Sequence, residues 1–205
     1  MNQQMTTFYI VRHGETDWNT KKLIQGITDN PLNAKGEIQA KELGEKLRHI
    51  KFDMAFSSDL LRAKRTAEII ALEHQLEVQT TNFLRERDYL SLEGQSSDIY
   101  RTYDKLMEKL SHEDRRRHRI VDGIENDEEL VSRIFTFLRE TAITHPGKTI
   151  LMVTHGGILR ALIIHLGIMS YKDTYQVKNT AYITLSSDGI EFFVKETEGI
   201  EKVSN

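Results

Sequence analysis

Two kinds of hydrophobic pattern alternate along the chain. Residues 8–11 and 150–153 are short, continuous apolar runs, which are typical of strands buried on both faces of a sheet. Elsewhere, apolar residues recur every three or four positions among charged ones, which predicts helices. The segments with this helical spacing are residues 34–50, 60–72, 128–144 and 158–166. The alternation predicts an α/β fold whose sheet is parallel or mostly parallel and is covered on both faces.

Local signals predict which side of the first helix is buried and which residues cap the second helix. Ile38, Leu43, Leu47 and Ile50 share a helical spacing, which is typical of a helix with its apolar side on the core. Ser57-Ser58-Asp59 precedes the second helix, and side chains of these types commonly accept hydrogen bonds from the first free N–H groups of a helix. We therefore expect this segment to cap the second helix.

Turn-forming residues divide the last third of the chain. His145-Pro146-Gly147 ends the third helix, because proline cannot continue the helical hydrogen bonds. Residues 181–185 and 190–194 resemble strands on either side of Ser187-Asp188-Gly189, which predicts a β-hairpin.

Composition restricts the class of protein. The chain has 205 residues, a hydrophobic share of 39% and a charged share of 29%, as in globular proteins. A net charge of -3 gives no general attraction for nucleic acid or an anionic membrane, so we expect neither as a partner. The longest apolar stretches, about eight residues, are too short to span a bilayer. No signal peptide is recognisable, and we expect a cytoplasmic protein. The absence of cysteine excludes disulfides and thiol nucleophiles.

Each of the two apolar runs ends in a histidine followed by glycine. Arg12-His13-Gly14-Glu15 follows the first run and Thr154-His155-Gly156-Gly157 follows the second. In sheets of this class, ligands bind beyond the carboxyl ends of the strands. The pattern therefore predicts that the two histidines meet over one pocket, although they are far apart in sequence.

The residues around these histidines suit a phosphate ester. Such a dianion needs fixed positive charge, and an arginine can contact two phosphate oxygens at once. Arg12 adjoins His13, and Arg62 lies near the start of the second helix. An imidazole with an ordinary pKa near 6.5 is a natural nucleophile, and neighbouring arginines keep it unprotonated. The leaving oxygen needs a proton, for which Glu86 is the candidate; chemistry alone does not choose it over Asp88 or Glu93.

An ordered set of motifs covers nearly the whole chain. They are residues 10–19 (IVRHGETDWN), 25–32 (QGITDNPL), 57–63 (SSDLLRA), 84–86 (LRE), 125–133, 154–157 (THGG) and Asn179-Thr180. In sequence and order this set resembles the histidine phosphatase superfamily, also called phosphoglycerate mutase-like. The resemblance implies a three-layer α/β/α sandwich with a mostly parallel sheet and an antiparallel edge strand.

The same resemblance assigns roles to individual residues. It implies that His13 is phosphorylated, that Arg12, Arg62 and His155 hold the phosphoryl oxygens, and that Glu86 protonates the leaving group and then activates water. The residues expected to contact the substrate are Asn19, Gln25, Gly26 and, through its backbone, Gly156. No metal or nucleotide cofactor is expected. Two histidines and a glutamate could form a zinc site, but no close pair of histidines with ligand spacing occurs.

Two departures from the family pattern lie outside the nucleophile motif. The family usually has glycine four residues after the acid, where this chain has Leu90, and Asp122-Gly123-Ile124-Glu125-Asn126 replaces the commoner Gly-Gly-Glu-Ser. The first departure could move the acid loop, and the second touches the region that faces the substrate. We interpret the second as a difference in specificity.

Residues 87–125 are the least regular part of what we expect to be one domain over residues 1–205, and they are the expected lid or specificity insertion. The basic run Arg115–Arg119 within them has two interpretations. It is either a solvated face paired with Glu113, Asp114 and Glu125, or a lid that recognises extra negative charge on the substrate.

Three functions remain open at this stage. The first is a cofactor-independent phosphomonoesterase acting on a small phosphorylated metabolite. The second is a phosphoglycerate mutase that depends on 2,3-bisphosphoglycerate. The third is a family member that binds phosphorylated ligands without turnover. The chain is shorter than typical mutases, and it has Gly157 and the segment Arg87-Asp88-Tyr89 where mutases have other residues, which favours the phosphatase. A homodimer is possible.

Overall fold

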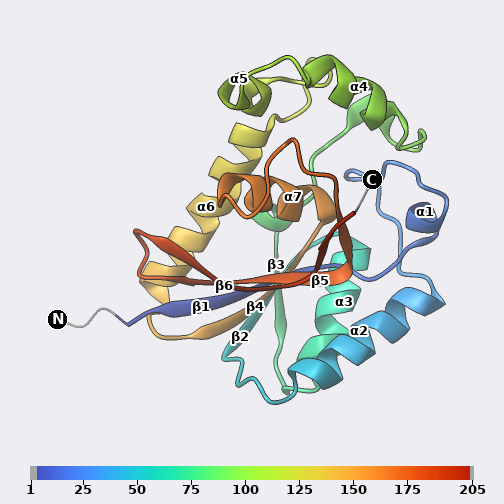
Figure 1. Cartoon of the computed structure of the whole chain (residues 1–205). Helices are drawn as coiled ribbons and strands as arrows, with labels where there is room; N and C mark the ends of the chain where they lie inside the picture. The colour runs from blue at the N-terminus through green and yellow to red at the C-terminus, as the bar shows by residue number, and fades with distance from the viewer. Residues whose placement is uncertain (1–3, 204–205) are drawn as a thin grey trace.

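The computed structural model describes residues 4–203 and is built around one six-stranded sheet (Figure 1). The strands are β1 (Thr6–Arg12), β2 (Met54–Ser58), β3 (Val78–Thr81), β4 (Thr149–Thr154), β5 (Tyr175–Ser187) and β6 (Phe192–Lys202), in the order β3-β2-β4-β1-β5-β6. The first four are parallel to one another, and β5 and β6 add an antiparallel edge. The predicted sheet, mostly parallel with an antiparallel edge, is confirmed.

Helices cover both faces of this sheet and make a three-layer α/β/α sandwich (Figure 1). The helices are α1 (Asp17–Thr20), α2 (Ala34–Leu47), α3 (Leu61–Leu72), α4 (Ile99–Met107), α5 (His112–Arg117), α6 (Asp127–Thr144) and α7 (Gly156–His165), with short 3-10 turns at Asn82–Leu84 and Leu90–Leu92. Each β1 and β4 residue points to the face opposite its neighbour's, so the continuous apolar runs serve both layers. None of the helices within residues 4–203 has the length and apolar character needed to cross a membrane.

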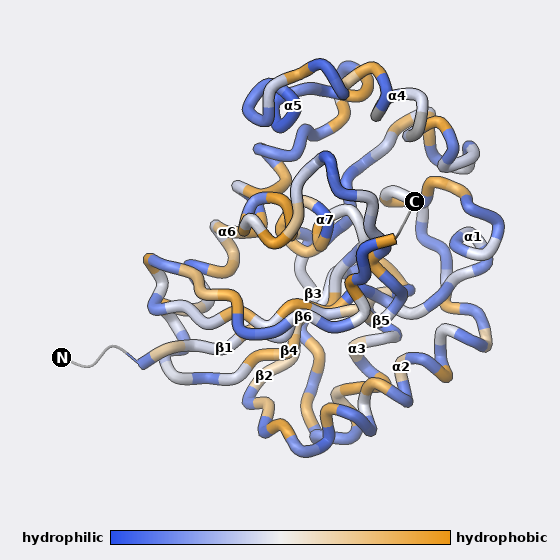
Figure 2. Tube along the Cα trace, viewed as in Figure 1, coloured by the Kyte–Doolittle hydropathy of each residue, from blue (hydrophilic) through white to orange (hydrophobic). Residues whose placement is uncertain are grey.

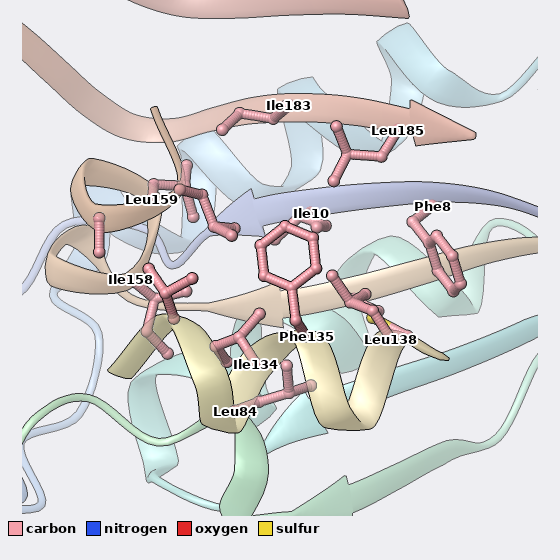
Figure 3. Packing of buried hydrophobic residues seen from close by; sticks show 14 of the residues in the cluster. Phe8, Ile10, Leu84, Ile134, Phe135, Leu138, Ile158, Leu159, Ile183 and Leu185 are labelled. Carbon is pink, nitrogen blue, oxygen red and sulfur yellow. The ribbon is translucent and has the colours of Figure 1, made fainter. Parts of the chain in front are cut away.

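One face of the sheet packs against α6 and α7. Figure 3 shows Phe8 and Ile10 of β1 lying against Ile134 and Leu138 of α6, with α7 beside them. All four of these side chains are at most 1% exposed. On the opposite face, α2 and α3 pack on the remaining residues of β1 and β4. Figure 2 shows hydrophobic residues concentrated along the central strands and hydrophilic ones around α5.

The expected core position of Ile38 in α2 is wrong, because its side chain is 55% exposed. The buried face of α2 consists of Gly36, Ala40, Leu43, Gly44 and Leu47. Small residues let this helix approach α3 closely, and a Cβ added to Gly44 would lie 3.5 Å from the Cα of Ile70. Leu43 and Leu47 are buried as expected, so weighing only the large apolar residues was wrong for Ile38 alone.

The expected cap of α3 is also wrong. Its N-cap residue is Leu60, which makes no side-chain capping bond. The N–H of Leu61 instead donates to Asp29 Oδ1 at 2.6 Å, so a loop distant in sequence supplies the acceptor. Asp59 accepts a hydrogen bond from Arg85 Nε at 2.7 Å. Asp59 lies one residue before the N-cap and is bound by this arginine.

The predicted hairpin exists but is longer and displaced. Strand β5 begins at Tyr175 and β6 continues to Lys202, whereas Ile190 lies in the turn and is 71% exposed. The pairing of the two strands is irregular between Val177 and Tyr182. Thr180 lies in this irregular stretch with a φ of 59°, in the left-handed region. The irregularity brings the Asn179-Thr180 segment to the end of β1.

Candidate active site

The ends of β1 and β4 bring the two histidines together. The register pairs Arg12 with Thr154, so the next residue of each strand continues side by side. The backbone N–H of His13 donates to the Thr154 carbonyl at 3.0 Å. The rings of His13 and His155 have their centroids 5.2 Å apart, and the two residues are only 3% and 0% exposed.

His13 is held with one ring nitrogen occupied. Its Nδ1 lies 2.7 Å from the carbonyl oxygen of Gly14. Because a carbonyl only accepts, Nδ1 carries the proton and Nε2 keeps its lone pair. Burial, followed by the positive charges of Arg62 and Arg12, holds the pKa of His13 well below its usual value. Near neutral pH the ring is therefore an uncharged imidazole with a free Nε2.

His155 is buried without a hydrogen-bond partner. Neither of its ring nitrogens contacts a donor or acceptor in the described part of the chain. Burial and the charge of Arg62 hold the pKa of His155 well below its usual value. An unpaired buried polar ring costs stability, and the two nitrogens remain available to a ligand.

Arg12 and Arg62 place positive charge on either side of this pair. Arg12 Nη1 donates to the Val177 carbonyl at 2.5 Å. Arg62 donates from Nη1 to the Thr28 carbonyl at 2.8 Å and from Nη2 to the Gly26 carbonyl at 2.6 Å. The Nε of each is buried and makes no hydrogen bond within residues 4–203. Burial lowers both pKa values to about 10, so both remain charged and have unused N–H groups for an anion.

Glu86 lies against the N-terminus of α7. Its Oε2 accepts a hydrogen bond from the N–H of Gly157 at 2.8 Å, and its Oε1 accepts one from the N–H of Arg87 at 3.0 Å. A Cβ on residue 157 would lie 2.3 Å from Oε1. A side chain at that position would therefore force the carboxylate to move.

The segment before Glu86 is tied to the rest of the protein through its backbone. Thr154 Oγ1 donates to the Leu84 carbonyl at 2.7 Å. Arg133 of α6 donates to the carbonyls of Phe83 and Arg85 at 2.6 and 3.1 Å. The acid is thus positioned by β4, α6 and α7 together.

The residues expected to contact the substrate are close to this centre but have structural partners as well. Asn19 Oδ1 accepts from the N–H of Thr16 at 3.1 Å and from Asn179 Nδ2 at 3.2 Å, while Gln25 Oε1 accepts from Thr16 Oγ1 at 3.0 Å. A Cβ added to Gly26 would lie 1.8 Å from Glu93 Oε1, so this glycine permits a close contact with the roof.

These groups adjoin a cavity of about 570 Å³. Its lining includes most of the predicted site, namely Arg12, Asn19, Gln25, Gly26, Arg62, Glu86 and Gly156. It also includes residues that the sequence did not point to, among them Lys22, Tyr100, Arg160, Tyr171 and Tyr175. Arg160 follows Gly156 by one helical turn, a spacing that could have identified it. Tyr171 has no such signal.

The cavity is positively charged although the chain is not. Six arginine or lysine residues and three acidic residues line it, a surplus of three positive charges, whereas the whole chain has a net charge of -3. Among the residues described, no group of three His, Asp or Glu side chains is arranged to hold a metal ion. The local charge favours an anionic ligand.

The basic run is paired with one of the expected acids, Glu113, and otherwise with acids of α6. Arg116 and Arg117 bind Glu128 of α6 at 2.7 and 3.0 Å, and Arg117 also binds Glu113. Glu125 instead binds Arg133, and Asp114 accepts from Ser111, so the expected pairing with Glu125 and Asp114 is wrong for these arginines. The helix α6 offered acids one turn further along, which the sequence does not distinguish.

Comparison with known proteins identifies the family. The sequence model of the histidine phosphatase superfamily (branch 1) matches residues 8–198. The uncharacterized phosphatase PhoE of Bacillus subtilis is 39% identical over 162 residues, 79% of this chain and 78% of that protein. A probable phosphoglycerate mutase, GpmB of Salmonella arizonae, is 38% identical over 159 residues, 78% of this chain and 74% of that protein. The crystal structure of a phosphoglycerate mutase from Bacillus anthracis matches with a TM-score of 0.81 at 28% identity, covering 97% and 94% of the two chains. The chain belongs to the histidine phosphatase superfamily.

Proposed function

We propose that this protein is a cofactor-independent phosphomonoesterase that hydrolyses a small phosphorylated metabolite through a phosphohistidine at His13. The observation that carries the proposal is the uncharged, buried His13, whose Nδ1 is fixed by the Gly14 carbonyl at 2.7 Å. Its Nε2 is thereby left as a nucleophile beside the unused N–H groups of Arg12 and Arg62.

The first chemical step forms one bond and breaks another. Nε2 of His13 attacks phosphorus, the bond between phosphorus and the ester oxygen breaks, and protonated Glu86 gives its proton to the leaving oxygen. The charge on the transferring group is stabilised by Arg12, Arg62 and His155. In the second step Glu86, now a carboxylate, takes a proton from water as the water oxygen bonds to phosphorus, and the bond between phosphorus and Nε2 of His13 breaks. Phosphate leaves and His13 returns to its starting form.

A phosphoglycerate mutase is the second candidate, and two observations favour it. The surplus of three positive charges in the cavity would suit a bisphosphate, and some relatives at 38% identity are named probable phosphoglycerate mutases. A mutase must return the phosphoryl group to its substrate and exclude water while it does so. The contact between Glu86 and Gly157, at a position where mutases have another residue, supports hydrolysis.

The test is release of phosphate from a panel of phosphomonoesters, including 3-phosphoglycerate, run beside a coupled mutase assay. Release without isomerisation would support the phosphatase, and EDTA should leave it unchanged because no metal takes part in the steps above. Isomerisation stimulated by 2,3-bisphosphoglycerate would replace the phosphatase by the mutase. Neither activity in a folded sample would overturn both and favour a binding protein.

A further inference from the structure

We infer that Tyr171 and Asp127 are positioning residues for the reaction, and that they act on Glu86 through Arg87. No motif discussed above contains Tyr171, and the mechanism assigns no role to any of these three residues. The inference rests on the proposed function, because it needs Glu86 to be the acid that protonates the leaving group.

A continuous line of hydrogen bonds joins these residues. The N–H of Arg87 donates to Glu86 Oε1 at 3.0 Å, and the same residue donates from Nη2 to Asp127 Oδ1 at 2.6 Å. The hydroxyl of Tyr171 donates to the other carboxylate oxygen, Oδ2, at 2.7 Å. Both oxygens of Asp127 are therefore occupied, and its position fixes the arginine that follows the acid.

Burial makes this line rigid and costly to break. The side chains of Arg87 and Asp127 are 8% and 25% exposed, far less than the paired side chains on the surface of α5. Removing one partner of a buried charge pair leaves the other without compensation. Burial and the negative charge of Asp127 raise the pKa of Tyr171, so its hydroxyl stays protonated and able to donate.

The two ends of the line belong to different parts of the fold. Asp127 is the first residue of α6, where Asn126 and Glu129 form a capping box and Leu130 is fully buried in the core. Tyr171 lies between α7 and β5, and α5 packs on its ring. The guanidinium of Arg115 is 4.6 Å from the ring centroid and the ring of His112 is 5.1 Å from it. The position of the acid is thus coupled to the contact between α5 and Tyr171.

Two substrates with different leaving groups distinguish a role in positioning Glu86 from a role in stability alone. An alkyl phosphate such as glycerol 3-phosphate needs a proton on its departing oxygen, whereas p-nitrophenolate departs without one. We therefore compare kcat/KM for glycerol 3-phosphate and p-nitrophenyl phosphate in the same variants. A misplaced acid lowers the first value and spares the second.

The variants are Tyr171→Phe, Asp127→Asn and Glu86→Gln. Glu86→Gln sets the scale and should lower kcat/KM for the alkyl ester by roughly 10²-fold or more relative to the aryl ester. Tyr171→Phe, which removes only a hydroxyl, should shift the same ratio by about tenfold, and Asp127→Asn by more, because misplacing a reacting group has large kinetic effects. Tyr103→Phe removes a hydroxyl from α4, away from this line, and should leave the ratio unchanged.

The outcomes distinguish the two proposals. A wild-type protein that hydrolyses neither ester overturns the proposed function and this inference with it. Hydrolysis by the wild type, together with an unchanged ratio in Glu86→Gln, removes Glu86 from its role as the acid. In the third outcome, Glu86→Gln lowers kcat/KM for the alkyl ester more than for the aryl ester, as expected. If Tyr171→Phe and Asp127→Asn then lower both values equally, or lower neither, the inference is overturned and the proposed function stands.

Discussion

The floor and the roof of the cavity are built in opposite ways. The floor consists of Arg12 and Arg62, which line the cavity, together with the adjoining His13 and His155. Of these residues, His13, Arg62 and His155 are 3%, 1% and 0% exposed. The roof, residues 87–125, includes the short helices α4 and α5, which lie at the top of Figure 1. The floor carries the groups that the chemistry needs, and the roof carries much of the lining that the rest of a substrate would meet.

Different forces hold the two regions. Two large apolar clusters, one on each face of the sheet, fix the strands that end at the floor. Under the roof, the apolar cluster formed by the described residues is small and centres on Ile24, Leu92 and Ile124. The ion pairs of α5 are partly exposed, and such pairs contribute little to stability. The comparison indicates that catalytic precision comes from the core, whereas the roof can vary without loss of the fold.

The most severe test of the floor is His13→Ala. Removing the nucleophile should lower kcat by roughly 10⁴-fold or more, since the remaining groups only bind and polarise the ester. The far-ultraviolet circular dichroism and the unfolding midpoint should stay close to those of the wild type. His49→Ala, which changes an exposed histidine, serves as the control. Full activity in His13→Ala would remove the phosphohistidine from the mechanism.

Gly157→Ala tests the contact between the floor and the acid. The new Cβ would lie 2.3 Å from Glu86 Oε1, so the carboxylate must move. We expect kcat/KM for an alkyl phosphate to fall by roughly 10²-fold, as for other small displacements of reacting groups. Gly44→Ala is the matched control, because its Cβ would meet other atoms only at 3.5 Å. Gly44→Ala lies within α2 and should leave activity intact. Activity retained in Gly157→Ala would show that the acid tolerates the displacement.

The buried histidines of the floor predict how stability depends on pH. Their pKa values are held well below 6.5 by burial and by the arginines, whereas in the unfolded chain they titrate near 6.5. Between the folded and unfolded pKa values the unfolded state binds more protons, so the free energy of unfolding decreases as pH falls below about 6.5. Each histidine contributes a slope that approaches about 1.4 kcal/mol per pH unit.

Urea unfolding of the wild type and His155→Asn between pH 7.5 and 5.5 measures this slope. The variant should lose the contribution of one histidine, and its stability should depend less steeply on pH. Equal slopes in the two proteins would mean that His155 titrates normally in the folded state, which would contradict its burial beside the arginines.

The sequence predicted the floor better than the roof for a physical reason. The strands at residues 8–11 and 150–153 are short, apolar and followed directly by His-Gly, so pattern and topology together placed both histidines at one edge. Local signals of this kind are absent from residues 87–125, where none of the residues of α5 is buried. Tyr171 and Asp127 are 44 positions apart, and the sequence between them carries no pattern that predicts their contact.

Errors within the regular elements have a similar origin. Ile38 was placed in the core because large apolar residues were weighed above small ones. Small residues complete the buried face of α2: Gly44 packs against Ile70 of α3, and Gly36 lies against the backbone of Glu15. Asp59 was placed as a cap because only neighbours in sequence were considered, whereas Arg85 binds it across the fold. Local propensity is a weak constraint where a tertiary partner competes for the same group.

The smallest expected effect concerns the two departures from the family pattern, which meet in the roof. Leu90 stands where the family usually has glycine, its φ is 52°, and a Cβ added to Gly123 would lie 3.2 Å from its Cδ1. A left-handed conformation costs a residue other than glycine roughly 1 kcal/mol.

Two substitutions of Leu90 measure this strain. Leu90→Gly and Leu90→Ala both remove the side-chain contact, but only alanine keeps the left-handed strain. Leu90→Gly should therefore be more stable than Leu90→Ala by about 1 kcal/mol in urea unfolding. At the exposed Ser132 of α6 the order should reverse, because alanine favours a helix over glycine by about 1 kcal/mol. If the alanine variant is the more stable one at both positions, residue 90 does not keep its left-handed backbone. The roof would then accommodate leucine by a change of conformation and not by a strained one.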